Sequence, residues 1–240
     1  MKKIIKGLLQ KFGMDLIHHR PHAPLDVFEY VLDSVARSTK DFYFVQVGAN
    51  DGVRYDPLRN AIRSHQIRGL CIEPLPDIFL QLVANYSDSP QLQFENCAIA
   101  ATRGTLDLYR YRADANVPDY AHGMATLDGD RLRSFSKRFG TQEDVVEKIS
   151  VPTDTFSSVI AKHQIGNVSL LQIDTEGYDF EVLRLAFEAG LRPMMVHYEH
   201  QLLSIGDRIL AEKLLAANGY GIIDETVDVL AMQLTSTRKW

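Results

Sequence analysis

Short apolar runs alternate with amphipathic stretches through most of the chain. From residue 41 onward the apolar runs are bounded by Gly, Pro and Asn, and apolar residues at helical spacing lie between them. This alternation is typical of a parallel sheet whose strands are connected by helices. It predicts strands at 43–47, 69–72, 92–98, 169–173 and 194–198, and helices at 57–64, 77–86, 156–162, 179–188 and 207–217. The predicted fold class is α/β, with a ligand crevice at the carboxyl ends of the strands.

The C-terminal part of the chain breaks the alternation. Residues 220–223 and 228–234 are two extended runs, and a short acidic connection joins them. Two extended runs with so short a connection predict an antiparallel hairpin. The sheet is therefore expected to end in a terminal antiparallel hairpin.

The N-terminal part, residues 1–40, is predicted to be a helical segment in front of the domain at 41–240. Five apolar side chains from Ile4 to Phe12 lie at helical spacing, with four lysines on the remaining surface. This basic amphipathic helix is expected to dock on its own domain or on a second subunit, which would make a homo-oligomer. Contact with an anionic membrane surface is the alternative. A second helix is predicted at 25–38.

A polar segment at about 112–148 interrupts the strand and helix pattern. Long segments inserted into a compact domain are usually functional or mobile. We interpret this one as an insertion that covers the substrate, and the alternative is a solvated excursion without a role in binding. Four side chains in or beside it are suited to stacking and hydrogen bonding with a substrate: Tyr111, Tyr120, His122 and Arg131.

Composition and charge limit the function classes. Of the 240 residues, 45% are hydrophobic and 24% are charged, as in an ordinary soluble protein. The net charge of -5 argues against a general nucleic-acid binder. Cys71 and Cys97 both lie in apolar runs, which is typical of reduced, buried thiols. Neither a membrane-spanning run nor a signal-peptide pattern is visible, so a cytoplasmic location is expected, with a peripheral position at the inner membrane face as an option.

The first predicted strand leads into a glycine turn, Val47-Gly48-Ala49-Asn50-Asp51-Gly52. Gly48 allows the backbone to turn sharply beneath a ligand, and Gly52 allows the next segment to pack close to the strand. Asn50 fills the middle glycine position of the dinucleotide motif, so a ligand without a pyrophosphate is favoured.

Polar residues also follow the next strands. Glu73 comes about 20 residues after the glycine turn, where a carboxylate accepts hydrogen bonds from both hydroxyls of a ribose. Asn96 ends the third strand, where it would meet an adenine edge or serve as an ordinary strand end. Asp174 and Glu176 follow the fourth strand, where charge is usually functional and helix capping is the alternative.

The glycine turn after the first strand and the polar residues after the next three strands together resemble the FkbM family of S-adenosylmethionine-dependent methyltransferases, over about residues 41–234. The matching pieces are FVQVGANDG, CIEPLPDIFLQL, NCAIA, ISVPTDTFSSVI and LLQIDTEGYDFEVL. The last piece is the most specific. The resemblance implies a Rossmann-like, seven-stranded class I methyltransferase sheet with an antiparallel last strand, and S-adenosylmethionine as the cofactor.

The resemblance also implies where the cofactor lies. The residues at the methionine part would be Gly48, Ala49, Asn50 and Gly52. The residues at the ribose and adenine would be Glu73, Pro74, Leu75, Asn96, Cys97 and Ala98, with Asp174 and Glu176 between the sulfonium and the acceptor. Gln46 stands at a cofactor-facing position where an aspartate is frequent, which removes a charged contact to the cofactor amine.

The sulfonium is already an activated methyl donor, so the protein has to supply in-line positioning, exclusion of water and, for a hydroxyl acceptor, a base. The catalytic candidates are Asp174, Glu176, His197 and Glu199. Strand alternation places His197 and Glu199 on one face and Tyr198 and His200 on the other. Asp174, Glu199 and a histidine would also suit a divalent metal, but histidines that only shape the pocket are favoured.

The expected function is O-methylation of a hydroxyl group on a sugar, a glycan or a secondary metabolite. One alternative is an NAD-dependent oxidoreductase or epimerase, since Glu73 would also suit a nicotinamide cofactor. The missing central glycine and the lack of a Tyr-x-x-x-Lys pair count against it. A non-catalytic cofactor-binding module is the second alternative.

Overall fold

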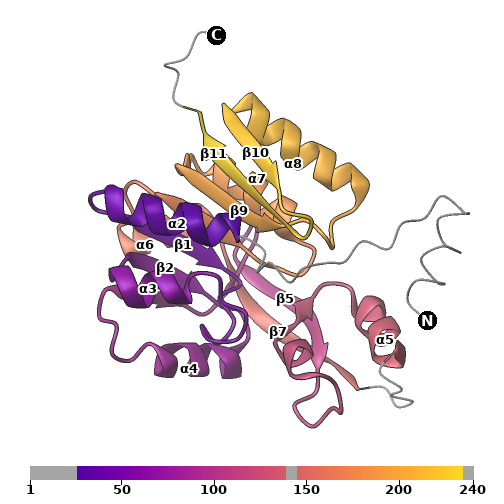
Figure 1. The fold of residues 1–240 in the computed structure, drawn as a ribbon. Helices are drawn as coiled ribbons and strands as arrows, with labels where there is room; N and C mark the ends of the chain where they lie inside the picture. The colour runs from indigo at the N-terminus through magenta and orange to yellow at the C-terminus, as the bar shows by residue number, and fades with distance from the viewer. Residues whose placement is uncertain (1–25, 139–144, 235–240) are drawn as a thin grey trace, which may run out of the picture.

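A seven-stranded sheet with the order β10-β11-β9-β8-β1-β2-β3 runs through the computed structural model, which describes residues 26–138 and 145–234 (Figure 1). Its strands are β1 (Tyr43–Val47), β2 (Arg68–Ile72), β3 (Leu92–Glu95), β8 (Leu170–Ile173), β9 (Met195–Glu199), β10 (Tyr220–Asp224) and β11 (Asp228–Gln233). The five strands β3, β2, β1, β8 and β9 are parallel to one another, whereas β11 is antiparallel to β9 and to β10. The predicted α/β sheet with a terminal antiparallel hairpin is confirmed.

Helices cover both faces of this sheet. One face carries α2 (Val27–Ser38), α3 (Arg59–His65) and α4 (Pro76–Asn85), and the other carries α6 (Phe156–His163), α7 (Asp179–Glu188) and α8 (Ile205–Ala217). Central strands are consequently buried along their whole length, because side chains pointing either way meet a helix. Each predicted strand and helix between residues 43 and 217 lies within a few residues of an observed one, but the predicted strand at 92–98 divides in two.

A second sheet, which the sequence analysis did not predict, lies beside the first with the order β4-β7-β5-β6 (Figure 1). Its strands are β4 (Ala98–Ile99), β5 (Gly104–Tyr111), β6 (Ala125–Thr126) and β7 (Val146–Asp154). Between β5 and β7 the chain also forms the short helix η1 (Asp119–Gly123) and the helix α5 (Gly129–Arg138). Most of the predicted insertion at 112–148 is therefore structured, and both long strands beside it belong to this sheet.

Asn96 explains why the predicted strand 92–98 divides. Its side-chain amide donates hydrogen bonds to the backbone oxygens of Glu73 (2.8 Å) and Pro74 (3.2 Å), which fixes a turn after β3. Ala98 then begins β4, which pairs with β7 instead of β2. The chain changes sheets at this turn.

The predicted helix at Ile4 to Phe12 lies outside the described residues, so its docking and membrane contacts stay predictions. In the part of the chain that the structure describes, no helix is long and apolar enough to cross a membrane.

Candidate active site

The turn after β1 lies directly against the end of β8. Gly48 has φ +83°, and a Cβ atom placed on it would lie 1.7 Å from the backbone oxygen of Asp174. The backbone N–H groups of Gly48 and Ala49 both donate to the oxygen of Ile72 at 3.0 Å, and Asp174 N donates to Val47 O at 2.9 Å. The carboxyl ends of β1, β2 and β8 are thereby fixed to one another.

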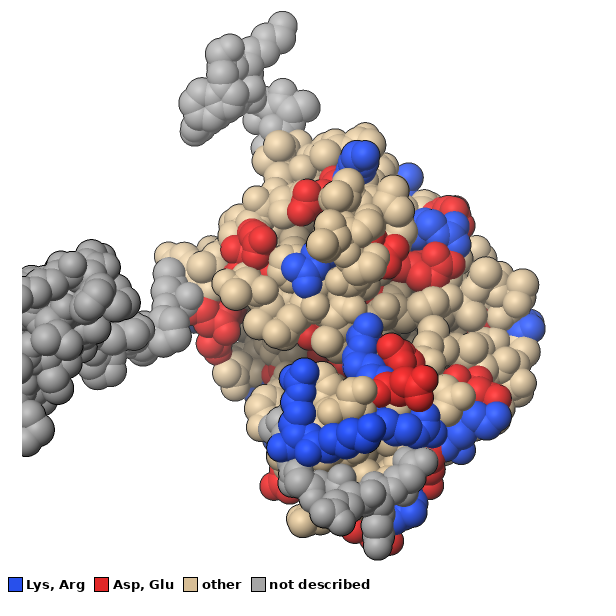
Figure 2. Space-filling model, turned by 90° about the vertical axis from the view of Figure 1, so that its right-hand side faces the viewer, with Lys and Arg blue, Asp and Glu red and all other residues tan. Residues whose placement is uncertain are grey.

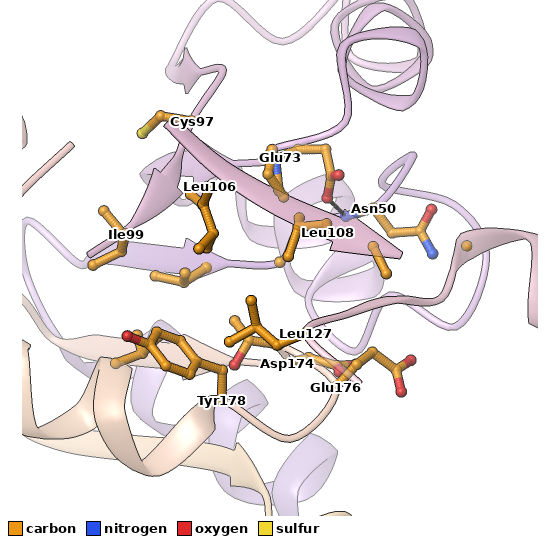
Figure 3. A pocket seen from close by; sticks show the side chains of 18 residues that line it. Asn50, Glu73, Cys97, Ile99, Leu106, Leu108, Leu127, Asp174, Glu176 and Tyr178 are labelled. Carbon is orange, nitrogen blue, oxygen red and sulfur yellow. Dashed lines mark hydrogen bonds between the residues drawn. The ribbon is translucent and has the colours of Figure 1, made fainter. Parts of the chain in front are cut away.

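Glu73 is held at the end of β2 by two backbone donors. Its Oε2 accepts from Asn50 N (Figure 3) and its Oε1 accepts from Leu75 N, both at 2.9 Å. Burial raises the pKa of Glu73 to about 7, although the two hydrogen bonds act in the opposite direction. Each carboxylate oxygen has a further lone pair, so Glu73 is able to accept two more hydrogen bonds from a ligand.

Glu73 opens into a narrow space of about 90 Å³, the inner cavity. Eight of the predicted site residues line it: Gly48, Asn50, Glu73, Pro74, Cys97, Ala98, Asp174 and Glu176. The sequence analysis missed its apolar lining, which includes Ile99, Leu106, Leu108, Ala125, Leu127, Tyr178 and Val182. Much of that apolar lining belongs to the second sheet and to the segment that follows η1, and Figure 3 shows several of these side chains directed into the same space as Asp174.

A larger space of about 560 Å³, the outer cavity, adjoins the inner one. Three further predicted residues, Gln46, Ala49 and Glu199, line it, together with residues that the prediction missed, such as Tyr55, Asp56, Phe135 and Gln172. The two cavities share five lining residues: Gly48, Asn50, Gly123, Asp174 and Glu176. A group that passes from one cavity to the other therefore passes Asp174 and Glu176.

Two carboxyl groups, Asp174 and Glu176, belong to this shared wall, and a third, Glu199, lines the outer cavity. Burial in the protein is the main cause that raises the pKa of Asp174 to about 7, that of Glu199 to about 8 and that of Glu176 to about 9. Neighbouring carboxylates add to each rise, and the guanidinium of Arg131 opposes it at both glutamates. The Asp174 side chain is nevertheless open to solvent inside the cavities, so a bound ligand would change its surroundings most directly.

Asp179 shapes the turn that presents these groups. It is fully buried at the start of α7 and accepts hydrogen bonds from Thr175 N (3.2 Å) and Gly177 N (3.1 Å). Between these donors Glu176 has φ +52°, a conformation that non-glycine residues seldom adopt. Such outliers often accompany functional sites.

Four predicted site residues, Leu75, Gly52, Asn96 and His197, lie outside both linings, and Leu75 is fully buried. Gly52 has no room for a side chain because Tyr86 and Leu82 of α4 pack on it, so it serves helix packing and not packing on the strand. Asn96 holds the Glu73 loop through the hydrogen bonds described above. His197 is only 4% exposed and stacks on Phe28 with ring centroids 3.8 Å apart.

The side chain of His197 lies among other side chains of the protein. Its Nδ1 lies 2.7 Å from Gln172 Oε1, and its Nε2 lies 3.2 Å from Glu225 Oε2. Both ring nitrogens therefore have partners within the protein. His197 thus contacts Gln172, which lines the outer cavity, and its catalytic role stays a prediction.

The predicted substrate contacts in the insertion are mostly placed elsewhere. Tyr111 is 2% exposed and donates from its hydroxyl to Leu132 O at 2.7 Å, so it is a core residue. His122 and Arg131 do not line either cavity, although Arg131 donates to Leu202 O at 3.2 Å beside the outer one. The side chain of Tyr120 lies outside the described part of the structure.

The alternative of a metal site is not supported by the geometry. Nowhere in the described ranges do three or more His, Cys, Asp or Glu side chains gather in a way that would hold a metal ion. Asp174, Glu199 and a histidine, the predicted ligand set, do not converge.

Comparisons with known proteins agree with this architecture. The family model described as the methyltransferase FkbM domain matches residues 46–220, well over half of the chain. No protein of curated function matches the chain.

Solved structures also match the chain, each at low identity. Methyltransferase FkbM from Methylobacillus flagellatus KT is 16% identical with a TM-score of 0.49, and the match covers 80% of this chain and 44% of that one. An RNA methyltransferase from Salinibacter ruber in complex with S-adenosyl-L-homocysteine is 12% identical with a TM-score of 0.42, covering 88% and 92%. A human methyltransferase 10 domain containing protein is 10% identical with a TM-score of 0.47, covering 98% and 95%. The chain thus spans less than half of the length of the first of these.

Proposed function

Because the chain belongs to the FkbM methyltransferase family, we propose that it transfers the methyl group of S-adenosylmethionine to a hydroxyl group of a sugar, a glycan or a secondary metabolite. One observation carries the proposal: two adjoining cavities share a wall that holds Gly48, Asp174 and Glu176. We assign the inner cavity to the cofactor and the outer cavity to the acceptor.

The inner cavity suits a nucleoside with a short polar extension. Glu73 is placed to accept hydrogen bonds from two ribose hydroxyls, since each of its oxygens has one donor among the residues that the structure describes. Apolar side chains such as Leu106 and Leu108 offer a surface for a flat base. Gly48 and Asp174 line the same end of this cavity, where the methionine end would lie.

Methyl transfer to a hydroxyl group requires positioning of the acceptor and one proton transfer. Bound S-adenosylmethionine supplies a methyl group whose bond to the sulfonium breaks with the electron pair moving to sulfur. The protein holds the acceptor oxygen in line with that bond, and a carboxylate accepts the hydroxyl proton. Asp174 and Glu199 suit this role because both line the outer cavity, and Oε2 of Glu199 has no hydrogen-bond partner among the described residues. A positive charge nearby favours the ionised form of both acids.

The outer cavity favours a neutral, hydroxyl-rich acceptor over an anionic one. Four of its lining side chains are acids (Asp56, Asp174, Glu176 and Glu199), whereas Arg54 is its one basic lining residue. The face in Figure 2 carries Lys and Arg in a band and a group of Asp and Glu beside that band. We therefore propose a small-molecule or glycan acceptor, no nucleic acid, and a reaction in the cytoplasm.

Calorimetric titration tests the cofactor first. Wild-type protein is expected to bind S-adenosylmethionine and S-adenosylhomocysteine with micromolar affinity, and Glu73→Ala is expected to lose that binding. The exposed Glu212→Ala serves as the matched control. Binding of NAD in place of the other two ligands would establish the oxidoreductase alternative, and binding of none would favour a non-catalytic module.

Transfer of a radiolabelled methyl group to a panel of hydroxylated compounds then tests the acceptor class. Sugars, oligosaccharides and polyketide alcohols are the positive arms, and amines, RNA and carboxylic acids are the contrasting arms. Label recovered only in the contrasting arms would refute O-methylation while leaving the cofactor assignment intact.

A further inference from the structure

A segment from the second sheet passes between the two cavities. This segment, which we call the strap, comprises residues 123–131. It runs from the last residue of η1 through β6 into the first turn of α5. Gly123 lines both cavities, Met124 lines the outer one, and Ala125 and Leu127 line the inner one. Because neighbouring side chains of an extended chain point to opposite sides, the strap presents one face to each cavity.

Three contacts attach the strap to loops of the proposed active site. Gly123 lies against Asn50, whose Nδ2 would be 2.2 Å from a Cβ placed on that glycine. The hydroxyl of Thr126 donates to the backbone oxygen of Glu176 at 3.0 Å and accepts from Asp128 N at 3.2 Å. Farther along, Arg131 donates to the backbone oxygen of Leu202. The strap is therefore fixed to the same turns that carry the acids.

The inner face of the strap is apolar. Leu127 is 39% exposed, and Figure 3 shows it directed into the space that Leu106 and Leu108 also face. A leucine so exposed beside other apolar side chains gains stability when a ligand covers it.

We propose that the strap is the second half of the cofactor site. Leu127 contacts the nucleoside part of the cofactor from the side opposite Gly48, and Thr126 is the positioning residue that holds Leu127 there through its bond to Glu176 O. This inference rests on the proposed function, since it assumes that the inner cavity takes S-adenosylmethionine. It assigns cofactor contacts to a segment that the sequence suggested for the acceptor.

Binding of S-adenosylhomocysteine and of 5′-methylthioadenosine to the full chain tests the role of Leu127. Leu127→Ala is expected to weaken both ligands by about tenfold, because the lost contact is with the nucleoside that they share. Leu210→Ala removes a comparably exposed leucine on α8, 49% exposed, and is expected to bind both ligands like the wild type. A loss seen with S-adenosylhomocysteine alone would move Leu127 to the amino-acid end and overturn the assignment.

A second set of variants tests Thr126. Thr126→Val keeps the side-chain volume but removes the hydroxyl, and it is expected to raise the dissociation rate of S-adenosylhomocysteine by about fivefold. Thr126→Ser retains the hydroxyl and is expected to restore the wild-type rate. Thr105→Val, on the exposed part of β5, is the control for the same substitution.

The outcomes separate the two proposals. A wild-type protein that binds neither ligand refutes the cofactor assignment and with it the strap. Wild-type binding with an unaffected Leu127→Ala variant refutes the strap alone. Equal losses in Thr126→Val and Thr126→Ser would show that packing, and not the hydroxyl, holds the segment, which overturns the role given to Thr126.

Discussion

Gly48 is the residue whose identity the backbone restricts most. Its positive φ is open to glycine at little cost, and the position that a Cβ would take is filled by the backbone oxygen of Asp174. The atoms that this Cβ would meet all belong to the backbone of Asp174, so no side chain can move aside to make room. An added methyl group must therefore push apart the ends of β1 and β8, which carry the proposed cofactor and acceptor contacts.

Gly48→Ala is accordingly expected to abolish binding of S-adenosylhomocysteine and to lower the free energy of unfolding by about 2 kcal/mol or more. Calorimetry and urea unfolding measure the two effects. Gly166→Ala is the control, because no atom lies within 4 Å of a Cβ placed there. Wild-type affinity in Gly48→Ala would show that the turn relaxes without affecting the cofactor.

Glu199 is the residue that tests the proton transfer. Its unpartnered oxygen lines the outer cavity near Asp174, so Glu199→Gln keeps the shape of the cavity but removes a base. The expected result is a fall in kcat of about 100-fold with little change in cofactor affinity. Methyl transfer to an acceptor found in the screen measures it, and repetition with a chelator examines the metal alternative. Unchanged turnover would assign the proton to Asp174 or to water.

At the scale of elements, continuous apolar runs made the central sheet predictable. The strands β1, β2, β8 and β9 are buried on both faces, so each appears in the sequence as a short, mostly apolar run, with one polar residue inside β1, β8 and β9 (Gln46, Gln172 and His197). The strands β5 and β7 are only half buried and alternate polar with apolar residues, as at Leu106, Asp107 and Leu108. That period-two pattern was the available signal for the second sheet.

The same contrast explains which site residues were predictable. Gly48, Glu73 and Asp174 follow parallel strands, whose carboxyl ends meet at one edge of the sheet, so their proximity follows from topology. Leu106, Leu108 and Leu127 reach the inner cavity through packing between two sheets, which the sequence alone does not specify. His197 was correctly placed on the face of Glu199, but its partners depend on where α2 and the terminal hairpin pack.

The helix α2 illustrates how such packing supports the site. Phe28 is buried and stacks on the His197 ring, which in turn holds Gln172 at the outer cavity. Phe28→Ala is expected to lower the free energy of unfolding by about 3 kcal/mol, since it leaves a cavity and an unsupported imidazole. Chemical denaturation measures it, with Tyr30→Ala on the same helix, 66% exposed, as the control. Equal stabilities of the two variants would contradict a stabilising role for the stacking of Phe28 on His197.

At the scale of the whole molecule, acidic side chains gather where the two sheets meet. Glu73, Asp174, Glu176 and Glu199 all line the inner or outer cavity, and each has a pKa raised mainly by burial. A protein without a ligand keeps these carboxylates close together at a cost in stability. A bound sulfonium would offset part of that cost, so the charge pattern that weakens the free fold favours a cationic cofactor.

This arrangement predicts an unusual pH dependence of stability. In the unfolded chain the four acids titrate near their ordinary values, whereas the folded pKa values are about 7 for Glu73 and Asp174, 8 for Glu199 and 9 for Glu176. Between pH 5 and pH 9 the folded protein therefore binds more protons than the unfolded chain, so stability is greatest at the acid end and is lost as the pH rises through the folded values.

Thermal unfolding of the ligand-free protein is accordingly expected to show a Tm that falls by at least about 3 °C from pH 5 to pH 9. Glu199→Gln should flatten part of the fall, because it removes one of the groups that gain charge, whereas the exposed Glu212→Gln should not. Saturating S-adenosylmethionine should raise the Tm more at pH 8 than at pH 6, since ionised acids face its positive charge. A Tm that rises with pH across this range would mean that the acids are well solvated in the free protein and that the cavities are more open than their lining suggests.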